Sequence, residues 1–278
     1  MSILPVISIQ GHPGSFHDIA RRKYFKNGHD LLCRDDFKRI FKDIQEGSAD
    51  FAVIAAENSL YGSLHQVYDL LQKHRHWISG EIYLRIEHCL LGVEGAEAAG
   101  IKEVHSHPIA LAQCEEYLDT VLFNAERFEH HDTAASAANV AQWNDTSKAA
   151  IASQEAGKLH GLKTIAKNVE TNKHNYTRFI VLQKKRSDTA QTSDKSSIIL
   201  YTDHQPGALH RALGVFAEFE INLTKLESRP IIGKAWHYMF YIDFEAGLHE
   251  ARTLQAFGKL KSTGNQIIEL GSYLRGIR

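Results

Sequence analysis

The sequence lacks the charge surplus and the cysteine pairs that mark several classes of protein. The net charge is -1 at pH 7 and the pI is near 7.0, so there is neither the basic footprint of a nucleic-acid-binding protein nor an acidic tail. Any anionic ligand must therefore be bound by local donors. The three cysteines, Cys33, Cys89 and Cys114, are far apart and odd in number, which favours free thiols in a reducing compartment over disulfides.

Targeting segments and metal motifs are also missing. The first residues, MSILPVISIQ, have neither a basic region nor a long apolar core, which argues against a signal peptide and a membrane span. We therefore expect a cytoplasmic protein. The seventeen histidines include the close pairs His74/His76, His105/His107 and His130/His131, but no pair has HExxH or Cys/His spacing. We interpret them as solvated or packing residues and expect no metal.

What the sequence does have is the composition of an ordinary globular protein. Hydrophobic residues make up 43% and charged residues 23%, close to the average for such domains, which excludes disordered and fibrous classes. At 278 residues the chain has room for two or three domains, with cores large enough to need no disulfide or metal.

Up to residue 182, apolar runs alternate with segments of helical periodicity. Phe37, Ile40, Phe41 and Ile44 recur at i, i+3, i+4 and i+7, and Gly47 follows where a helix should end. This alternation predicts an α/β fold with mainly parallel sheets, divided into two lobes with a cleft between them. The predicted strands are 6–9, 51–56, 81–93, 148–153 and 176–182, and the predicted helices are 14–25, 64–71, 108–118 and 133–143.

The composition changes at 184–196, KKRSDTAQTSDKS, which has no large apolar side chain and predicts a linker. After it the pattern predicts βαββαβ, the split ferredoxin-like order. We therefore predict domains at 1–183 and 197–278. One expected helix face consists of Leu209, Leu213, Phe216 and Phe219, and one expected strand face of Trp236, Tyr238, Phe240, Ile242 and Phe244.

Seven motifs occur in one order along nearly the whole chain. They are QGHPGSFHDIA at 10–20, AAENSLYGS at 55–63, VHSHPIALAQCEEYL at 104–118, DTAASAANVA at 132–141, NYTRFIVL at 175–182, PGAL at 206–209 and INLTKLESRP at 221–230. Together they resemble the prephenate dehydratase family with a C-terminal ACT regulatory domain. The family usually has Thr before and Ser after the Phe of the glycine turn, whereas this chain has Ser15 and His17. Ser15 keeps the hydroxyl, and the role of His17 is open.

The resemblance implies a two-lobed, periplasmic-binding-protein-like catalytic domain with a cleft, followed by a ferredoxin-like ACT domain. It implies decarboxylating dehydration of prephenate to phenylpyruvate in L-phenylalanine biosynthesis, with L-phenylalanine as allosteric inhibitor. No metal and no organic cofactor are implied, because aromatisation of the ring drives the reaction. We expect no nucleic-acid or membrane partner and a homodimer or homotetramer.

By this resemblance Thr177, in the Thr-Arg-Phe motif, assists the departure of the ring hydroxyl. A neutral threonine is a poor acid, so we interpret its part as a hydrogen bond to the leaving oxygen. Alternation along a strand places the Arg178 side chain opposite that of Thr177. Arg178 therefore either braces the motif by pairing with an acid such as Glu57, which we favour slightly, or contacts substrate at a strand end.

Three further residues complete the expected catalytic set: Asn58, Ser106 and Gln113. Asn58 and Ser59 follow the strand at 51–56, and the carboxyl ends of strands in open α/β sheets carry their ligand sites. Ser106 precedes a predicted helix with Pro108 near its start, and Gln113 lies two turns further on. We expect Ser106 to cap this helix and Gln113 to reach into the cleft.

Several small polar residues stand at predicted helix starts, where free N–H groups favour anions by roughly 0.3–1 kcal/mol each. They are Gly14 with Ser15, Ser63, Ser106 and Thr133. Converging on one cleft, such ends would bind a dianion without a basic surface. The expected substrate-binding residues are Gly14, Ser15, Glu57, Ser59, Thr133, Ser136 and Phe179.

In the C-terminal module, PGAL and ESRP resemble the phenylalanine-binding motifs of this ACT class, at an interface between two modules. The expected effector residues are Pro206, Gly207, Ala208, Leu209, Asn222, Glu227, Ser228, Arg229 and Pro230. Two other functions stay open: an arogenate dehydratase, and a binding protein that senses phenylalanine without catalysis. Chorismate mutase activity is not expected, because the first lobe begins within ten residues of Met1.

Overall fold

The computed structural model describes residues 4–26, 28–186 and 192–276, which divide by their contacts into two compact units. The first unit comprises Met1–Val67 and Ile82–Phe179, and the second comprises Tyr68–Glu81 and Ile180–Ile277. Within these described residues, no helix has both the length and the apolar character needed to cross a membrane.

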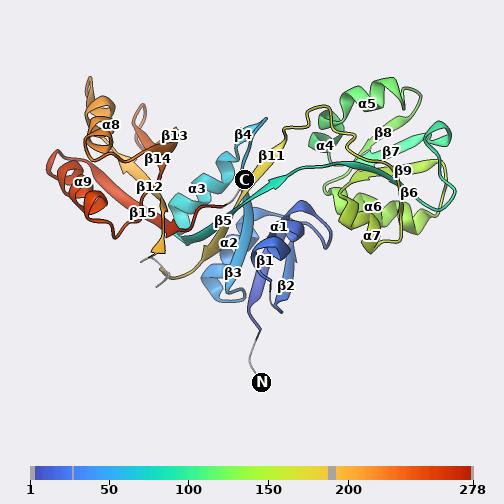
Figure 1. The fold of residues 1–278 in the computed structure, drawn as a ribbon, viewed down its shortest axis with the longest axis horizontal. Coiled ribbons are helices and arrows are strands. Elements are labelled where there is room, and N and C mark those ends of the chain that lie inside the picture. Colours follow the sequence, from blue (N-terminus) through green and yellow to red (C-terminus); the bar gives the residue numbers. More distant parts are fainter. Residues whose placement is uncertain (1–3, 27, 187–191, 277–278) are drawn as a thin grey trace. The chain divides into compact units, whose positions relative to one another are not determined.

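Strands and helices alternate along the first unit, as Figure 1 shows. Its strands are β1 (Val6–Gln10), β2 (Asp30–Arg34), β3 (Phe51–Asn58), β4 (Gly62–Ser63), β6 (Cys89–Gly92), β7 (Glu103–Ser106), β8 (Glu126–Glu129), β9 (Lys148–Ala152) and β10 (Lys163–Ala166). Its helices are α1 (Phe16–Tyr24), α2 (Phe37–Glu46), α4 (Pro108–Gln113), α5 (Glu115–Thr120), α6 (Thr133–Trp143) and α7 (Gln154–Leu159), with a 3-10 turn at Ala98–Gly100. The chain passes from one unit to the other within α3 (His65–His74), β5 (Trp77–Arg85) and β11 (Tyr176–Gln183).

The first lobe of this unit is built on the strand order β2-β1-β3-β11, in which β1 lies parallel to both β2 and β3. Helix α2 begins at the N-cap Asp36, whose side chain accepts from Arg39 N–H, and ends at Gly47 in the left-handed conformation. The predicted apolar face of α2 is buried, so the helix and its end are confirmed.

The second lobe is a five-stranded sheet, in the order β10-β6-β9-β7-β8, with helices on both faces. Leu90 and Ile151 pack on one face with α4 and α5, whereas Leu91 and Ala150 pack on the other with α6 and α7. Because helices cover both faces of this sheet, β6 and β9 consist of consecutive apolar residues and do not alternate between apolar and polar ones.

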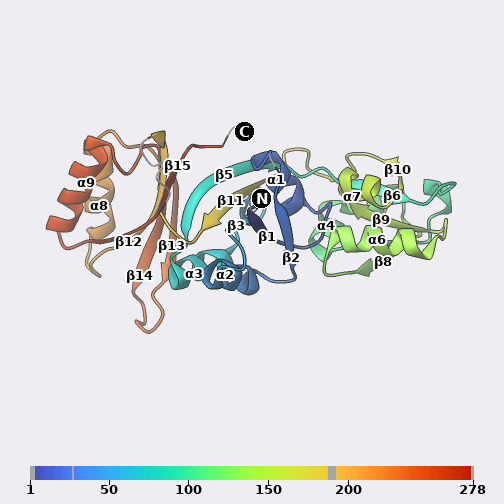
Figure 2. The same ribbon diagram turned by 90° about the horizontal axis from the view of Figure 1, so that it is seen from below.

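The second unit has the predicted βαββαβ order: β12 (Lys195–Tyr201), α8 (Ala208–Glu218), β13 (Leu223–Pro230), β14 (Tyr238–Phe244), α9 (Ala251–Ser262) and β15 (Gln266–Tyr273). Helices α8 and α9 lie side by side on one face of the sheet (Figures 1 and 2), over Ile198, Leu200 and Ile242. On the opposite face Tyr241 donates its hydroxyl to the Tyr68 carbonyl at 2.6 Å. Residues 68–81 therefore cover the sheet of this unit.

The predicted fold class is confirmed, with three corrections. Both sheets are mixed, because β6 pairs antiparallel with β9 and with β10. The helix expected at 108–118 breaks at Cys114, which ends α4 and precedes α5. Trp236 lies before β14 with a φ of 64° and is exposed, so it is not part of the expected strand face.

The predicted domain limits of 1–183 and 197–278 stay predictions. Residues 187–191 of the expected linker lie outside the described residues, and β12 already begins at Lys195.

Candidate active site

A cavity of about 320 Å³ is lined by both lobes of the first unit. The lining residues come from seven separate parts of the sequence: 10–17, Asp35, 55–64, 86–88, 107–113, 131–133 and 177–179. Of the predicted site residues, the cavity brings together Ser15, Asn58, Gln113, Thr133, Thr177 and Phe179. Its volume suits a small organic molecule.

Polar side chains in this cavity are histidines, hydroxyls, amides and the two carboxylates Asp35 and Asp132. Among the described residues that line it there is no lysine or arginine, but there are five histidines: His12, His17, His88, His107 and His131. An anion in this cavity would therefore be bound by neutral donors and helix N-termini.

Thr177 and Asn58 meet at the cavity wall. The Asn58 side-chain amide donates to Asn175 Oδ1 at 2.8 Å and to Thr177 Oγ1 at 3.0 Å. Its own Oδ1 accepts from the backbone N–H groups of Leu60 and Tyr61 at 2.9 and 3.1 Å, which fixes which end of the amide faces Thr177. Because Thr177 Oγ1 accepts from Asn58, its hydroxyl proton remains available to donate toward the cavity.

Arg178 points away from the cavity, as alternation along β11 requires. Its guanidinium Nη1 lies 3.6 Å from Glu57 Oε2, and its side chain is buried. Neither residue is among those lining the cavity. This geometry suits the bracing role for Arg178 and takes Glu57 away from direct substrate contact.

The glycine turn before α1 is held by a buried carboxylate that sequence reasoning missed. Asp18 accepts from Gly14 N–H at 2.9 Å and from Arg21 Nε at 2.9 Å. Burial raises the pKa of Asp18, but these hydrogen bonds outweigh it, so the pKa lies below the usual 3.8. Ser15 is the N-cap of α1 and accepts from Asp18 N–H at 3.3 Å, which confirms its predicted place at a helix start.

The turn also contacts the second lobe through its glycines. Gly14 has a φ of 84°, and a Cβ there would lie 2.8 Å from the Ala156 Cα. The Gly14 carbonyl accepts from Ser153 Oγ at 2.6 Å. Gly14 itself does not line the cavity, so its part is to let the two backbones approach each other.

The N-terminus of α6 also faces the cavity. Asp132 is its N-cap, accepting from Ala135 N–H at 2.7 Å, and Thr133 is its first residue. His12 Nδ1 lies 3.6 Å from Asp132 Oδ1. Ser136 is buried and donates to the Asp132 carbonyl at 2.9 Å, so it supports this helix start from outside the cavity lining.

The predicted capping role of Ser106 is wrong. His107 is the N-cap of α4 and accepts from Ile109 N–H. Ser106 is still part of β7, fully buried, and donates to the Ile151 carbonyl at 2.5 Å. In the sequence, a serine one residue before the N-cap gives the same pattern as a serine at the N-cap. Only the residue at which β7 ends distinguishes these two positions.

Gln113 ends α4 and lines the cavity, where its Oε1 lies 2.8 Å from His88 Nε2. Because an amide oxygen only accepts, His88 Nε2 is the donor. Burial lowers the pKa of His88, which keeps its ring neutral. The His88 backbone N–H donates to the buried Glu170 Oε2 at 2.9 Å.

Ser59 and Ser63 differ in their position relative to the cavity. Ser59 Oγ donates to the His174 carbonyl at 3.0 Å and accepts from Tyr176 N–H at 2.9 Å, so it ties the loop after β3 to β11 and does not line the cavity. Ser63 does line it, from β4 just before α3. In the part of the chain that is described, no group of three or more His, Cys, Asp or Glu could hold a metal.

His17, whose role the sequence left open, projects from α1 into the cavity lining. Its Nε2 accepts from the Ala55 backbone N–H at 3.1 Å. Burial lowers its pKa from the usual 6.5 to about 4, so the ring is neutral near pH 7.

In the second unit, the expected effector residues do not share one pocket. A pocket of about 170 Å³ includes Ala208 and Leu209, with His204, His237 and Phe240, but no residue of Glu227–Pro230. Gly207, with a φ of 77°, starts α8, and the Pro206 carbonyl accepts from Arg211 at 3.2 Å.

The ESRP segment is engaged within the unit. Arg229 Nη2 lies 2.9 Å from both carboxylate oxygens of Asp69, and Lys225 Nζ lies 2.9 Å from Glu227 Oε2. Lys225 also stands 4.9 Å from the centre of the Tyr68 ring. Residues 68 and 69 belong to α3, so this segment is attached to the middle of that helix.

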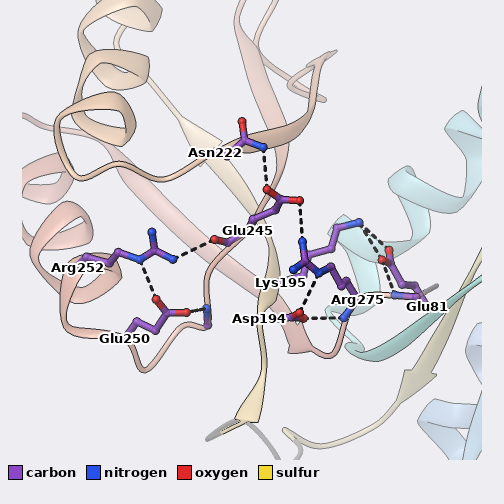
Figure 3. A network of polar contacts seen from close by, with 10 residues as sticks. Glu81, Asp194, Lys195, Asn222, Glu245, Glu250, Arg252 and Arg275 are labelled. Carbon is purple, nitrogen blue, oxygen red and sulfur yellow. Dashed lines mark hydrogen bonds and ion pairs between the residues drawn. The ribbon is translucent and has the colours of Figure 1, made fainter. Parts of the chain in front are cut away.

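Asn222 belongs to a separate polar network, shown in Figure 3. It donates to Glu245 Oε2 at 2.8 Å, and Glu245 Oε1 lies 3.1 Å from Arg275 Nη1. Nearby, Lys195 Nζ pairs with Glu81 at 2.8 Å, with both side chains buried. Asn222 is therefore an exposed member of this network and does not line the pocket beside Ala208.

Sequence reasoning missed four lining histidines, His12, His88, His107 and His131, and the cap Asp132. A signal existed, because the histidine count was high and three of the four lie in or next to quoted motifs. The sequence does not show that these motifs converge on one cavity.

Comparisons with known proteins agree on one family. The family model described as prephenate dehydratase matches residues 7–187, and the ACT domain model matches 196–262. A curated relative from Arabidopsis thaliana, "Arogenate dehydratase/prephenate dehydratase 1, chloroplastic", is 38% identical over 285 residues, covering 96% of this chain and 71% of the relative.

Two solved structures are similar over nearly the whole chain. One, described as GqqA, a novel type of quorum quenching acylase, has a TM-score of 0.86 and 31% identity, covering 97% of this chain and 98% of its own. The other, prephenate dehydratase from Arthrobacter aurescens in complex with L-Phe, has a TM-score of 0.85 and 27% identity, covering 97% and 90%. With a family model spanning most of the chain and a relative this similar, the chain belongs to the prephenate dehydratase family and carries a C-terminal ACT domain.

Proposed function

We propose that this chain converts prephenate to phenylpyruvate, with loss of water and carbon dioxide, and that L-phenylalanine inhibits it through the ACT domain. The observation that carries the proposal is the Asn58–Thr177 hydrogen bond at the wall of a cavity lined by both lobes. The family membership supports the same reaction class.

The substrate places two demands on the site. Prephenate carries two carboxylates, so the cavity must bind a dianion. The N-terminus of α1 at Ser15 and that of α6 at Thr133 both face the cavity, and each such end favours a carboxylate by roughly 0.3–1 kcal/mol. The neutral histidine and amide donors add hydrogen bonds without a permanent positive charge.

The second demand is the departure of the ring hydroxyl. The bond from the ring to the departing carboxylate supplies the electron pair that makes the ring aromatic, the ring C–O bond breaks, and the hydroxyl leaves as water after gaining a proton. Negative charge therefore grows on the leaving oxygen. The Thr177 hydroxyl, oriented by Asn58, donates a hydrogen bond to that oxygen and stabilises the charge. The proposed catalytic residue is thus Thr177, and Asn58 positions it.

Gln113, Ser15, Thr133 and Phe179 are proposed to contact the substrate, because they line the same cavity. Arg178 and Glu57 brace β11 from the opposite side. Gly14, Ser59, Ser106 and Ser136 shape the surrounding backbone through the hydrogen bonds described above. For these residues the proposed role is positional.

Prephenate and arogenate differ only in a keto group and an amine, and the relative from Arabidopsis is named for both activities. We favour prephenate, because Asp132 is already the N-cap of α6, so Asp35 is the other carboxylate among the described lining residues that could bind an ammonium. A homodimer or homotetramer and a cytoplasmic location remain predictions.

The experiment is turnover of prephenate and of arogenate by the purified chain, followed by ultraviolet absorbance of phenylpyruvate and by amino-acid analysis of phenylalanine. We expect phenylpyruvate from prephenate, slower or no phenylalanine from arogenate, and inhibition by added L-phenylalanine. A third sample with an N-acylated amine tests the activity named for the GqqA structure. Binding of phenylalanine without any turnover would instead support a sensing protein.

A further inference from the structure

His17 stands where the family usually has a small hydroxyl residue, and its ring is held in one orientation. The Ala55 backbone N–H donates to Nε2 at 3.1 Å. The ring lies edge-on to Phe179, with centroids 5.0 Å apart and an interplanar angle of 85°, and tilted to Phe37 at 6.1 Å. Phe179 belongs to β11 and Phe37 to α2, so these two elements of the first lobe hold the His17 ring in place.

This hydrogen bond decides which ring nitrogen carries the proton. A backbone N–H can only donate, so Nε2 must accept, and in a neutral imidazole the proton then lies on Nδ1. Burial lowers the pKa of His17 to about 4, which keeps the ring neutral at the pH of a cell. The Nδ1–H has no hydrogen-bond partner in the described part of the chain, and His17 is part of the cavity wall.

A serine hydroxyl at the same place would differ in two respects. It rotates freely, and it can either donate to a substrate oxygen or accept from a substrate N–H. The fixed imidazole can only donate, because its single lone pair is already used by Ala55. It therefore favours an acceptor oxygen and offers nothing to an ammonium group.

We propose that His17 is a substrate-binding residue that donates its Nδ1–H to an acceptor oxygen of the bound substrate. This inference rests on the proposed function, because it concerns the same cavity. The oxygen belongs either to the keto group, which arogenate lacks, or to a carboxylate that prephenate and arogenate share.

Two variants separate the two hydrogen bonds of His17. In His17→Gln the side-chain amide reaches the place of Nε2, so its oxygen still accepts from Ala55 N–H, but the donor at the Nδ1 place is lost. In His17→Asn the amide reaches the place of Nδ1, so a donor remains, but Ala55 N–H loses its acceptor. The matched pair thus distinguishes substrate binding from support of the fold.

For His17→Gln we expect KM for prephenate to rise by about 10-fold, with kcat changed less than about 2-fold and the melting temperature nearly unchanged. For His17→Asn we expect a lower melting temperature but a KM within about 3-fold of the unmodified chain. If KM for arogenate rises equally in His17→Gln, the oxygen is a shared carboxylate. If only the prephenate KM rises, it is the keto oxygen.

The inference would be overturned by an unchanged KM for both substrates in folded His17→Gln, or by an equal rise in KM in His17→Gln and His17→Asn. A loss of kcat at constant KM would also contradict it, because that pattern belongs to a residue acting in the transition state only. Absence of dehydration by the unmodified chain would overturn the proposed function instead, so the two failures are distinguishable.

Discussion

The cavity of the first unit and the effector segments of the second unit are assembled differently. Seven separate segments of one chain converge on the cavity, and the polar atoms of Asn58 and Thr177 in it are already hydrogen-bonded to each other. PGAL and ESRP, in contrast, do not share a pocket, and Arg229 and Glu227 are occupied by ion pairs within the unit. The proposed catalytic residues Asn58 and Thr177 are therefore brought together within one unit, whereas the pocket beside Ala208 lacks the residues of ESRP. That the effector site is completed by a second module stays a prediction.

Among the residues that position Thr177 or the effector segments, the largest effect is expected at Asn58. In Asn58→Ala the Thr177 hydroxyl loses its orienting donor and Asn175 loses a partner, so we expect kcat to fall about 10- to 100-fold, or about 1–3 kcal/mol of transition-state free energy. Steady-state kinetics with prephenate measures the loss, and phenylalanine binding by calorimetry should be unchanged. A kcat within about 2-fold of normal would show that Thr177 needs no such positioning.

Acid sensitivity should also differ between the units. The histidines whose pKa values burial lowers, His17, His88, His105 and His107, lie in the first unit. Below pH 6.5 these histidines bind protons in the unfolded chain but remain neutral in the folded chain. Stability is therefore complete above pH 6.5 and is lost as the pH falls toward the folded pKa, which is about 4 for His17.

For each such histidine the free energy of unfolding changes by at most about 1.4 kcal/mol per pH unit. Urea unfolding followed between pH 7.5 and pH 5 measures it, and His17→Gln should have a shallower slope than the unmodified chain. A free energy of unfolding that stays constant over this range would contradict the buried neutral histidines.

The smallest effect concerns the ESRP segment. In Asp69→Asn the ion pair with Arg229 is weakened, so the segment loses part of its attachment to the middle of α3. We expect the phenylalanine concentration that halves activity to change about 5-fold, a low value for a coupling free energy, while kcat without phenylalanine stays the same. The matched control is Glu218→Gln, which removes an exposed ion pair with Lys259 in the same unit. Equal responses of the two variants would rule out a specific role for Asp69.

Much of the fold could be predicted because its strongest signals are local. The face of α2 and its end follow from periodicity and from Gly47, and the bounds of α6 match the predicted helix at 133–143. β8 was not predicted, because its residues ERFE are all exposed at a sheet edge and carry no apolar pattern. The short β7 is buried inside the sheet, but its four residues EVHS include one large aliphatic side chain and so carry no apolar run. It was missed for that reason, and with it the true position of Ser106.

In the site, the residue types could be predicted but not their convergence. Thr177, Asn58 and Gln113 were found through motifs, and alternation correctly separated Thr177 from Arg178. Contacts such as Asp18 with Gly14, or Ser153 with Gly14, depend on turns and lobes meeting in space. No local pattern in the sequence specifies those contacts, and the same holds for the five histidines of the cavity.

The most direct test of the central claim is the single-turnover rate of prephenate dehydration in the unmodified chain, Thr177→Ser and Thr177→Val. Val has nearly the shape of Thr but no hydroxyl, whereas Ser keeps the donor. We predict that Thr177→Val remains folded and loses roughly 100- to 1,000-fold in rate, the usual cost of removing one transition-state donor, while Thr177→Ser stays within about 10-fold. A folded Thr177→Val that turns over prephenate at the unmodified rate would contradict the account.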